Sequence, residues 1–303
     1  MNVGFKTGPK NWEEGMRIVT EHGARLCEMW FRIDRAAAYD DRLSWLKKHE
    51  VRTGLHHWGV AAGKYKTNLA TNNTDIRQET IQQIKDTIDV GAKIDCAYVN
   101  AHPGAAQVEK LDLVGETQEP VAGEITDPEE SAALFLSAAE GLQAYAVKKG
   151  VLLTLETLPA REQYALGDRS RLYNPCNVPL AVMGKLGAQG NFLANDTTHT
   201  LAAVSVQASN QENLWQTFMQ FARAAAPFTH LLHINTLLLP HDGSDSHDGV
   251  TADDFAKNVA PTREQILEFL RVFAGREDVF VIPEPRNHMK ENYLALQALV
   301  NSL

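Results

Sequence analysis

The 303-residue chain has few cysteines, no long hydrophobic run and no excess of positive charge. Its three cysteines, Cys27, Cys96 and Cys176, are widely spaced and form no C-x-x-C pair, which argues against a disulfide framework or a cysteine-type zinc site. No stretch approaches the roughly 20 apolar residues that a membrane span requires, and the N-terminal residues lack the apolar core of a signal peptide. We therefore expect a cytoplasmic protein that does not bind membranes.

The charge balance is acidic, with 29 Lys and Arg residues against 38 Asp and Glu residues and a formal net charge of −9. This balance argues against a protein that holds nucleic acid by bulk charge alone. A local basic groove, or metal ions that reverse the sign locally, remain compatible with it. What the chain has in abundance is histidine, with eleven residues.

Glycine marks the change from a helical pattern to an apolar, strand-like run at five places: Gly23, Gly91, Gly150, Gly187 and Gly275. Each is interpreted as the residue just past a helix, where glycine adopts a left-handed conformation without steric cost. The five runs after these glycines, with those at 2–6, 51–57 and 230–235, make eight expected strands. Helical patterns follow the strands at about 11–22, 39–49, 74–90, 128–149, 177–186, 210–226, 262–274 and 288–302.

Strict alternation of strand and helix at this length predicts a (β/α)₈ TIM barrel that forms one domain over residues 1–303. The alternative is a doubly wound open sheet, but no G-x-G-x-x-G follows the first strand. In a barrel, the chemistry belongs at the carboxyl ends of the strands.

Imidazole and carboxylate groups stand at the ends of successive expected strands and in the loops that follow them. They are Glu28, His56, His57, His102, Glu156, Asp196, His199, His233, His241, Asp242, Asp245, His247 and Glu284. Taken singly, each is more commonly a helix cap, a surface group or a hydrogen-bonded core residue. Converging carboxylates would repel one another without cations, and imidazole with carboxylate suits Zn²⁺ or Mn²⁺. We therefore expect one to three divalent metal ions at this end of the barrel.

Several of these residues stand in recognisable motifs: Glu156 in TLETLP, Asp196 and His199 in the D-x-x-H of NDTTH, His233 in HIN and Glu284 in IPEP. With these motifs the chain resembles, over essentially its whole length, the xylose isomerase-like TIM-barrel superfamily. That superfamily contains divalent-metal sugar isomerases and epimerases as well as the zinc enzyme endonuclease IV. The resemblance implies that the motif residues bind a divalent metal ion.

Other motifs resemble the endonuclease IV branch. They are His102 in AHPG, the run Asp245-Ser246-His247, which is similar to D-R-H with Ser in place of Arg, and the Y-x-x-N-L run at 65–69. The strand-3 ligand of that branch would be His57, with His56 as the other candidate. With His199, the resemblance thus implies a nearly complete set of ligands for three metal ions.

The chain also departs from that branch. The N-D-S/K pattern after His233 becomes Asn235-Thr236-Leu237, the run at 248–251 replaces a glycine-rich one, and a segment at about 105–127 lengthens the loop after the fourth strand. These changes lie where a DNA-cleaving enzyme would meet its substrate.

Two chemistries fit such a site. The first is isomerisation, epimerisation or a related enediolate reaction on a small carbohydrate or polyol. Glu156, Asp196, His233 and Glu284 would hold the metal ion as a Lewis acid. Glu156 and Glu284 would remove and return the proton, and His199 would bind a substrate oxygen or hold a leaving proton.

The second chemistry is phosphodiester hydrolysis by a zinc-dependent AP endonuclease, and nucleic acid is a partner only in this case. The additional ligands His57, His102, Asp245 and His247 favour it. Against it, the segment 234–254 carries five aspartates and no Lys or Arg, whereas DNA-binding proteins concentrate basic residues along the backbone path. A non-catalytic metal-binding barrel is the third alternative. Because barrels of this type commonly associate, a homo-oligomer is left open.

Overall fold

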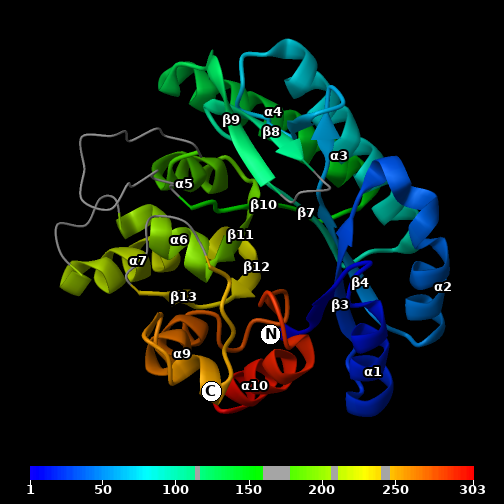
Figure 1. Ribbon diagram of the computed structural model, residues 1–303, viewed down its shortest axis with the longest axis vertical. Helices are drawn as coiled ribbons and strands as arrows, with labels where there is room; N and C mark the ends of the chain where they lie inside the picture. The colour runs from blue at the N-terminus through cyan, green and yellow to red at the C-terminus, as the bar shows by residue number, and fades with distance from the viewer. Residues whose placement is uncertain (113–116, 160–177, 206–210, 240–245) are drawn as a thin grey trace.

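The centre of the fold is a ring of parallel strands, seen in a computed structural model that describes residues 1–112, 117–159, 178–205, 211–239 and 246–303 (Figure 1). The sheet order is β1 (Asn2–Val3), β15 (Phe280–Pro283), β12 (Thr229–Ile234), β11 (Phe192–Asp196), β10 (Leu153–Glu156), β7 (Tyr98–Ala101), β4 (Arg52–His57), β3 (Leu26–Phe31) and β2 (Phe5–Thr7). Only Gly4 separates β1, which pairs with β15, from β2, which pairs with β3. The first strand therefore closes the ring, and the predicted TIM barrel is confirmed.

Helices surround the strands, as Figure 1 shows. They are α1 (Trp12–His22), the 3₁₀ helix η1 (Ile33–Tyr39) with α2 (Asp40–Lys48), α3 (Thr74–Ile94), α4 (Pro128–Lys149), α5 (Leu180–Ala188), α7 (Gln211–Ala225) with the short 3₁₀ helix η2 (Ala226–Phe228), α9 (Arg263–Arg271) and α10 (Met289–Asn301). Gly23 directly follows α1 and Gly150 directly follows α4, and both glycines adopt the left-handed backbone conformation that the glycine pattern predicts. Among the described residues, no helix combines the length and apolar character needed to cross a bilayer.

Apolar side chains form separate layers inside and outside the ring of strands. The outer layer packs helices on the sheet, with Ile18, Ile84 and Phe135 fully buried. Inside the barrel, a smaller cluster is built from Leu26, Ala97, Tyr98, Ala194, Leu231, Phe280 and Ile282. Successive side chains of a strand point to opposite faces of the sheet. Residues that belong to the inner cluster therefore alternate along the strands with residues that belong to the outer layer.

Several elements lie outside the eight predicted units. Helix α6 (Thr197–Ser205) follows β11, and α8 (Ala252–Phe255) and the strand pair β13 (Leu237–Leu238) and β14 (Val259–Ala260) follow β12. The inserted segment forms β8 (Gln107–Asp112) and β9 (Thr117–Ile125). These strands join β5 (Val60–Ala61) and β6 (Tyr65–Lys66) in a four-stranded sheet. This sheet is built from the loops after β4 and β7, at the end of the barrel where the candidate site lies.

Candidate metal centre

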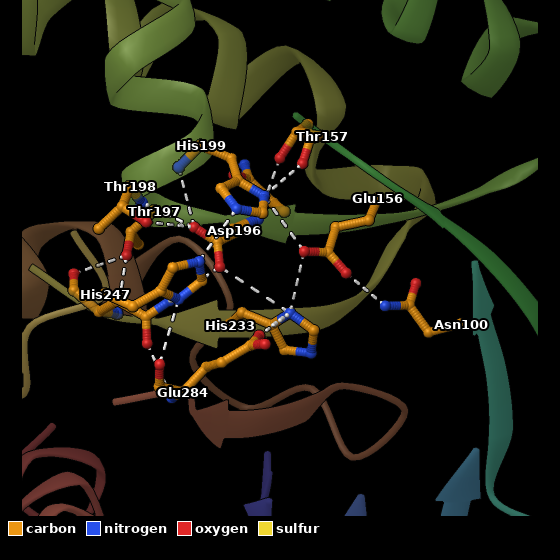
Figure 2. Close-up of polar contacts among 12 residues, drawn as sticks. Asn100, Glu156, Thr157, Asp196, Thr197, Thr198, His199, His233, His247 and Glu284 are labelled. Carbon is orange, nitrogen blue, oxygen red and sulfur yellow. Dashed lines mark hydrogen bonds and ion pairs between the residues drawn. The ribbon is translucent and has the colours of Figure 1, made fainter. Parts of the chain in front are cut away.

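Four buried side chains converge at the carboxyl ends of neighbouring strands, and we call them the quartet: Glu156, Asp196, His233 and Glu284. Glu156 and Asp196 end β10 and β11, His233 is near the end of β12, and Glu284 directly follows β15. Since these strands are neighbours in the sheet, their side chains point toward one another (Figure 2). One ligand atom from each lies within 4.8 Å of the others.

Three atoms of the quartet are buried and have no hydrogen-bond partner among the described residues: Glu156 Oε1, His233 Nδ1 and Glu284 Oε2. They lie together, with His233 Nδ1 3.3 Å from Glu156 Oε1 and 2.9 Å from Glu284 Oε2. Buried polar atoms are normally paired. Carboxylate oxygens and an imidazole nitrogen are also the ligands that divalent ions such as Zn²⁺ accept. The residues of the quartet therefore fit a divalent metal ion.

Glu28 fixes the orientation of His233 from the far side of the ring. Its Oε2 accepts hydrogen bonds from His233 Nε2 at 3.0 Å and from the Tyr98 hydroxyl at 2.9 Å. The Tyr98 ring reaches Glu28 because position 54 is glycine, where a Cβ would lie 2.3 Å from the ring. Because Nε2 of His233 donates to Glu28, its Nδ1 atom faces the other members of the quartet. Metal-binding histidines are commonly oriented by such a hydrogen bond from the second ring nitrogen to a carboxylate.

Asp196 is held by the start of α6 and by Asn235. Its Oδ1 accepts hydrogen bonds from the backbone N–H groups of Thr198 and His199 at 2.8 and 2.9 Å, and its Oδ2 accepts one from Asn235 Nδ2 at 2.8 Å. Asp196 thus acts as a cap for the helix. The first turn of α6 then places His199 beside it, which is the structural reason for the D-x-x-H spacing.

The electrostatics of the site favour ionised carboxylates. Burial raises the pKa of a carboxyl group, but His233 and Lys6 hold the pKa of Glu28 well below its usual range despite that burial. Burial likewise raises the pKa of Glu284 and of Glu156, but nearby charges lower both pKa values overall. Lys6 and His233 do so for Glu284, and His233 and His102 do so for Glu156. Burial also lowers the pKa of an imidazole, yet Glu28, Glu156 and Glu284 hold the pKa of His233 well above its usual value. A metal ion would therefore compete with a proton at His233.

A second group comprises His199 and His247, which we call the histidine pair, with Asp196 beside them. His199 Nδ1 lies 2.7 Å from the Thr157 carbonyl oxygen, and His247 Nδ1 lies 3.1 Å from that of Glu284. Because a carbonyl oxygen only accepts hydrogen bonds, His199 Nδ1 donates to Thr157, whereas His247 Nδ1 also lies 3.3 Å from Asn235 Nδ2. The two Nε2 atoms lie 3.3 Å apart, about the separation of two nitrogens bound tetrahedrally at roughly 2.0 Å to one zinc ion. Asp245, another predicted metal ligand, lies outside the described residues.

The structure places His56, and not His57, beside the other candidate ligands. His56 Nε2 lies 3.2 Å from His102 Nε2 and 3.7 Å from Glu156 Oε2. His57 points the opposite way, with Nδ1 3.1 Å from Thr87 Oγ1 on α3. Neighbouring residues of a strand face opposite sides of the sheet, so only one of the two can enter the barrel. The prediction that His57 faces the site is therefore corrected, since it is His56, of these two histidines, that does.

Sequence reasoning missed four residues that hold the site together: Lys6, Tyr98, Asn100 and Asn235. Lys6 contacts Glu28 and Glu284. Asn100 Nδ2 donates a hydrogen bond to Glu156 Oε2. A signal existed for Lys6, because a lysine inside an apolar strand is almost never buried unless it is paired. The others are ordinary polar residues whose role appears only when the strands are in register.

Comparisons with known proteins agree with this architecture. A family model described as xylose isomerase-like TIM barrel matches residues 16–174. No curated protein matches the chain. Similar solved structures include a D-tagatose 3-epimerase-like protein, with 14% identity, a TM-score of 0.63 and coverage of 99% of this chain and 98% of that one. The 3-keto-D-glucoside 4-epimerase of E. coli has 14% identity, a TM-score of 0.61 and 99% coverage of both chains. Endonuclease IV from Thermus thermophilus has 13% identity, a TM-score of 0.56 and 100% coverage of both.

Proposed function

Because this chain belongs to the xylose isomerase-like TIM-barrel family, we propose that it is a divalent-metal-dependent enzyme that isomerises or epimerises a small carbohydrate or polyol. The observation that carries the proposal is the convergence of three buried ligand atoms, from Glu156, His233 and Glu284, that have no hydrogen-bond partner among the described residues. Both carboxylate oxygens lie within 3.3 Å of His233 Nδ1. The likeness to sugar epimerases in fold supports the same class of substrate.

The two glutamates of the quartet are the proposed proton carriers. A divalent ion at the quartet supplies Lewis acidity toward adjacent carbonyl and hydroxyl oxygens of the substrate. Glu156 and Glu284 each approach His233 Nδ1, and both have a lowered pKa. One of the two carboxylates would accept the proton of the carbon next to the carbonyl. The other would take up a proton from solvent and deliver it to the adjacent position or the opposite face, and the first would then release its proton to solvent. In this proposal, His199 binds a substrate oxygen.

Proton exchange with solvent tests this proposal directly. Protein reconstituted with Mn²⁺ or Zn²⁺ is incubated in D₂O with a panel of free and phosphorylated ketoses, and deuterium at the carbons beside the carbonyl is followed by NMR. We expect exchange with at least one sugar, abolished in Glu156→Gln and Glu284→Gln. Glu264→Gln, which changes an exposed glutamate of α9, should keep the wild-type rate. Exchange that persists in Glu156→Gln would contradict the proposed carriers.

The histidine pair favours a second candidate, zinc-dependent cleavage of DNA at abasic sites. A sugar isomerase with one metal ion has no need of two facing Nε2 atoms next to the quartet, whereas a phosphodiesterase uses additional ions to bind phosphate oxygens and stabilise the leaving group. The fold of endonuclease IV is also similar.

Two measurements separate the candidates. The first is metal content per chain, since a single retained ion would contradict the endonuclease candidate. The second is nicking of an abasic-site duplex at low salt by protein that is fully loaded with zinc. Nicking that is lost in His247→Ala, with no deuterium exchange into any sugar, would replace the carbohydrate proposal by the endonuclease one.

A further inference from the structure

A lysine lies at the centre of the barrel, in contact with the candidate ligands. Lys6 is in β2 and is 2% exposed. Its Nζ is 3.0 Å from Glu28 Oε1 and 2.8 Å from His56 Nδ1, and it donates a third hydrogen bond to Glu284 Oε1. An ammonium group has three donors, so these partners use all of them. The ring of Trp30 covers Nζ, with its centroid 3.7 Å away. Lys6 is therefore a structural cation and is not placed to contact a substrate.

We propose that the Lys6 ammonium takes the place of a metal ion on the His56 side of the site, so that ions bind only at the quartet and the histidine pair. The inference rests on the metal dependence of the proposed function and extends it to the number of ions. Glu28, His56, His233 and Glu284 form one of the groups that could hold a metal ion. Lys6 already contacts three of these four residues.

The same contact places a positive charge beside the His56 ring. His56 Nδ1 lies 2.8 Å from Lys6 Nζ, and also 3.1 Å from Glu28 Oε1 and 3.4 Å from Asn100 Nδ2. The Nε2 atom of the same ring lies 3.2 Å from His102 Nε2, in the group of His56, His102 and Glu156 that could hold a metal ion. A divalent ion bound to that group would stand close to the Lys6 ammonium, and the two positive charges would repel each other in this buried position. Lys6 therefore disfavours a metal ion at His56 and His102.

Charge balance supports a fixed cation in this position. Four buried carboxylates, from Glu28, Glu156, Asp196 and Glu284, surround the site, and buried charges are costly unless they are compensated. Lys6 and two divalent ions, at the quartet and the histidine pair, together bring five positive charges against these four negative ones. Three divalent ions in addition to Lys6 would leave the same four carboxylates with a large positive excess.

Metal counting by mass spectrometry tests the proposal without an activity assay. The chain is reconstituted with excess Zn²⁺, desalted and analysed as wild type, Lys6→Met and the double variant Lys6→Met/His102→Ala. We expect Lys6→Met to retain one more ion per chain than wild type, and the double variant to lose that additional ion. Lys64→Met, which removes an exposed lysine of a nearby loop, should retain the wild-type number.

His102→Ala in the otherwise natural chain keeps the proposal testable if Lys6→Met does not fold by circular dichroism. We expect this variant to keep the wild-type metal number, because the Lys6 ammonium keeps a metal ion away from His102 in the natural chain. A folded Lys6→Met with the wild-type number, or a His102→Ala chain that loses an ion, would overturn the role of Lys6. A wild-type chain with three ions would do the same. A wild-type chain that retains no ion would contradict the proposed function as well.

Discussion

Glu28 Oε2 lies 3.0 Å from His233 Nε2, so that a carboxylate on the second strand of the barrel orients an imidazole on the seventh. The two residues are 205 positions apart in the chain and are both fully buried. Glu28 does not belong to the quartet. Because it contacts Nε2 of His233, however, Nδ1 is the nitrogen that faces the quartet. In metal sites, such carboxylate–histidine contacts fix the tautomer and raise the basicity of the ligand.

We predict that Glu28→Gln weakens binding of Mn²⁺ about 10–100-fold, because the amide no longer provides a charged acceptor for His233 Nε2. Isothermal titration calorimetry of the metal-free protein gives the dissociation constant. Tyr98→Phe is the matched control, since it removes a different hydrogen bond to Glu28 and leaves the Glu28–His233 contact in place. A wild-type dissociation constant in Glu28→Gln would show that Glu28 does not position His233.

A second prediction concerns Gly54, whose missing side chain makes room for the Tyr98 ring. Gly54→Ala should lower the free energy of unfolding by roughly 1–3 kcal/mol, because an added methyl group forces a packed neighbour to move. Gly141→Ala is the control, since a Cβ added at this position inside α4 would meet no atom within 4 Å. That change should raise the free energy of unfolding by up to about 1 kcal/mol through helix propensity. Urea titrations of both variants should therefore shift in opposite directions.

The barrel itself could be predicted from local signals, because each strand–helix unit repeats them. Gly23 and Gly150 do end helices, whereas Gly91 and Gly187 lie inside α3 and α5. A Cβ at Gly91 would lie 2.7 Å from Cys96 Sγ, and one at Gly187 would lie 2.0 Å from the ring of Phe228. These two glycines allow a neighbouring side chain to pack closely against the helix. A single sequence does not distinguish such a glycine from one that ends a helix, because the neighbour comes from elsewhere in the fold.

The candidate site was predictable where it depends on the ends of strands and not where it depends on register. Glu156 and Asp196 end their strands and His233 lies one residue before the end of its strand, so their convergence on one side of the barrel follows from the fold. Whether His56 or His57 enters the barrel depends on the pairing with β3 and β7, and a shift by one residue would exchange the two. Lys6 was missed for the same reason, because its partners come from distant strands.

Asn235 provides a third prediction, since it connects two members of the quartet. Its Nδ2 donates to Asp196 Oδ2 at 2.8 Å, and its Oδ1 accepts from the Glu284 backbone N–H at 2.7 Å. Asn235→Ala should cost about 1–3 kcal/mol of stability by leaving buried groups unpaired and should weaken metal binding about 10-fold or more. Asn258→Ala removes a hydrogen bond to the Leu239 carbonyl away from the quartet, so its metal affinity should match wild type. If Asn235→Ala bound the metal ion as tightly as the control Asn258→Ala does, Asn235 would not position the quartet.

The fourth prediction concerns the acid sensitivity of the fold through His57. The Thr87 hydroxyl donates to the Gln83 carbonyl and so accepts from His57 Nδ1, while His57 Nε2 has no partner among the described residues. Burial, helped by His56 and His102, lowers the pKa of His57 from 6.5 to about 3. Between these two values the unfolded chain binds more protons at this position than the folded chain. The stability is therefore fully present above pH 6.5 and falls as the pH drops through this window.

At pH 5, this difference amounts to about 2 kcal/mol of lost stability relative to pH 8. In His57→Phe the position cannot be protonated, so the loss between pH 8 and pH 5 should be smaller than in wild type by about that amount. Denaturant titrations with chelator present measure the difference without any contribution from acid release of metal. If both proteins lost stability equally between pH 8 and pH 5, His57 would not be held neutral against α3, and its placement outside the metal site would be wrong.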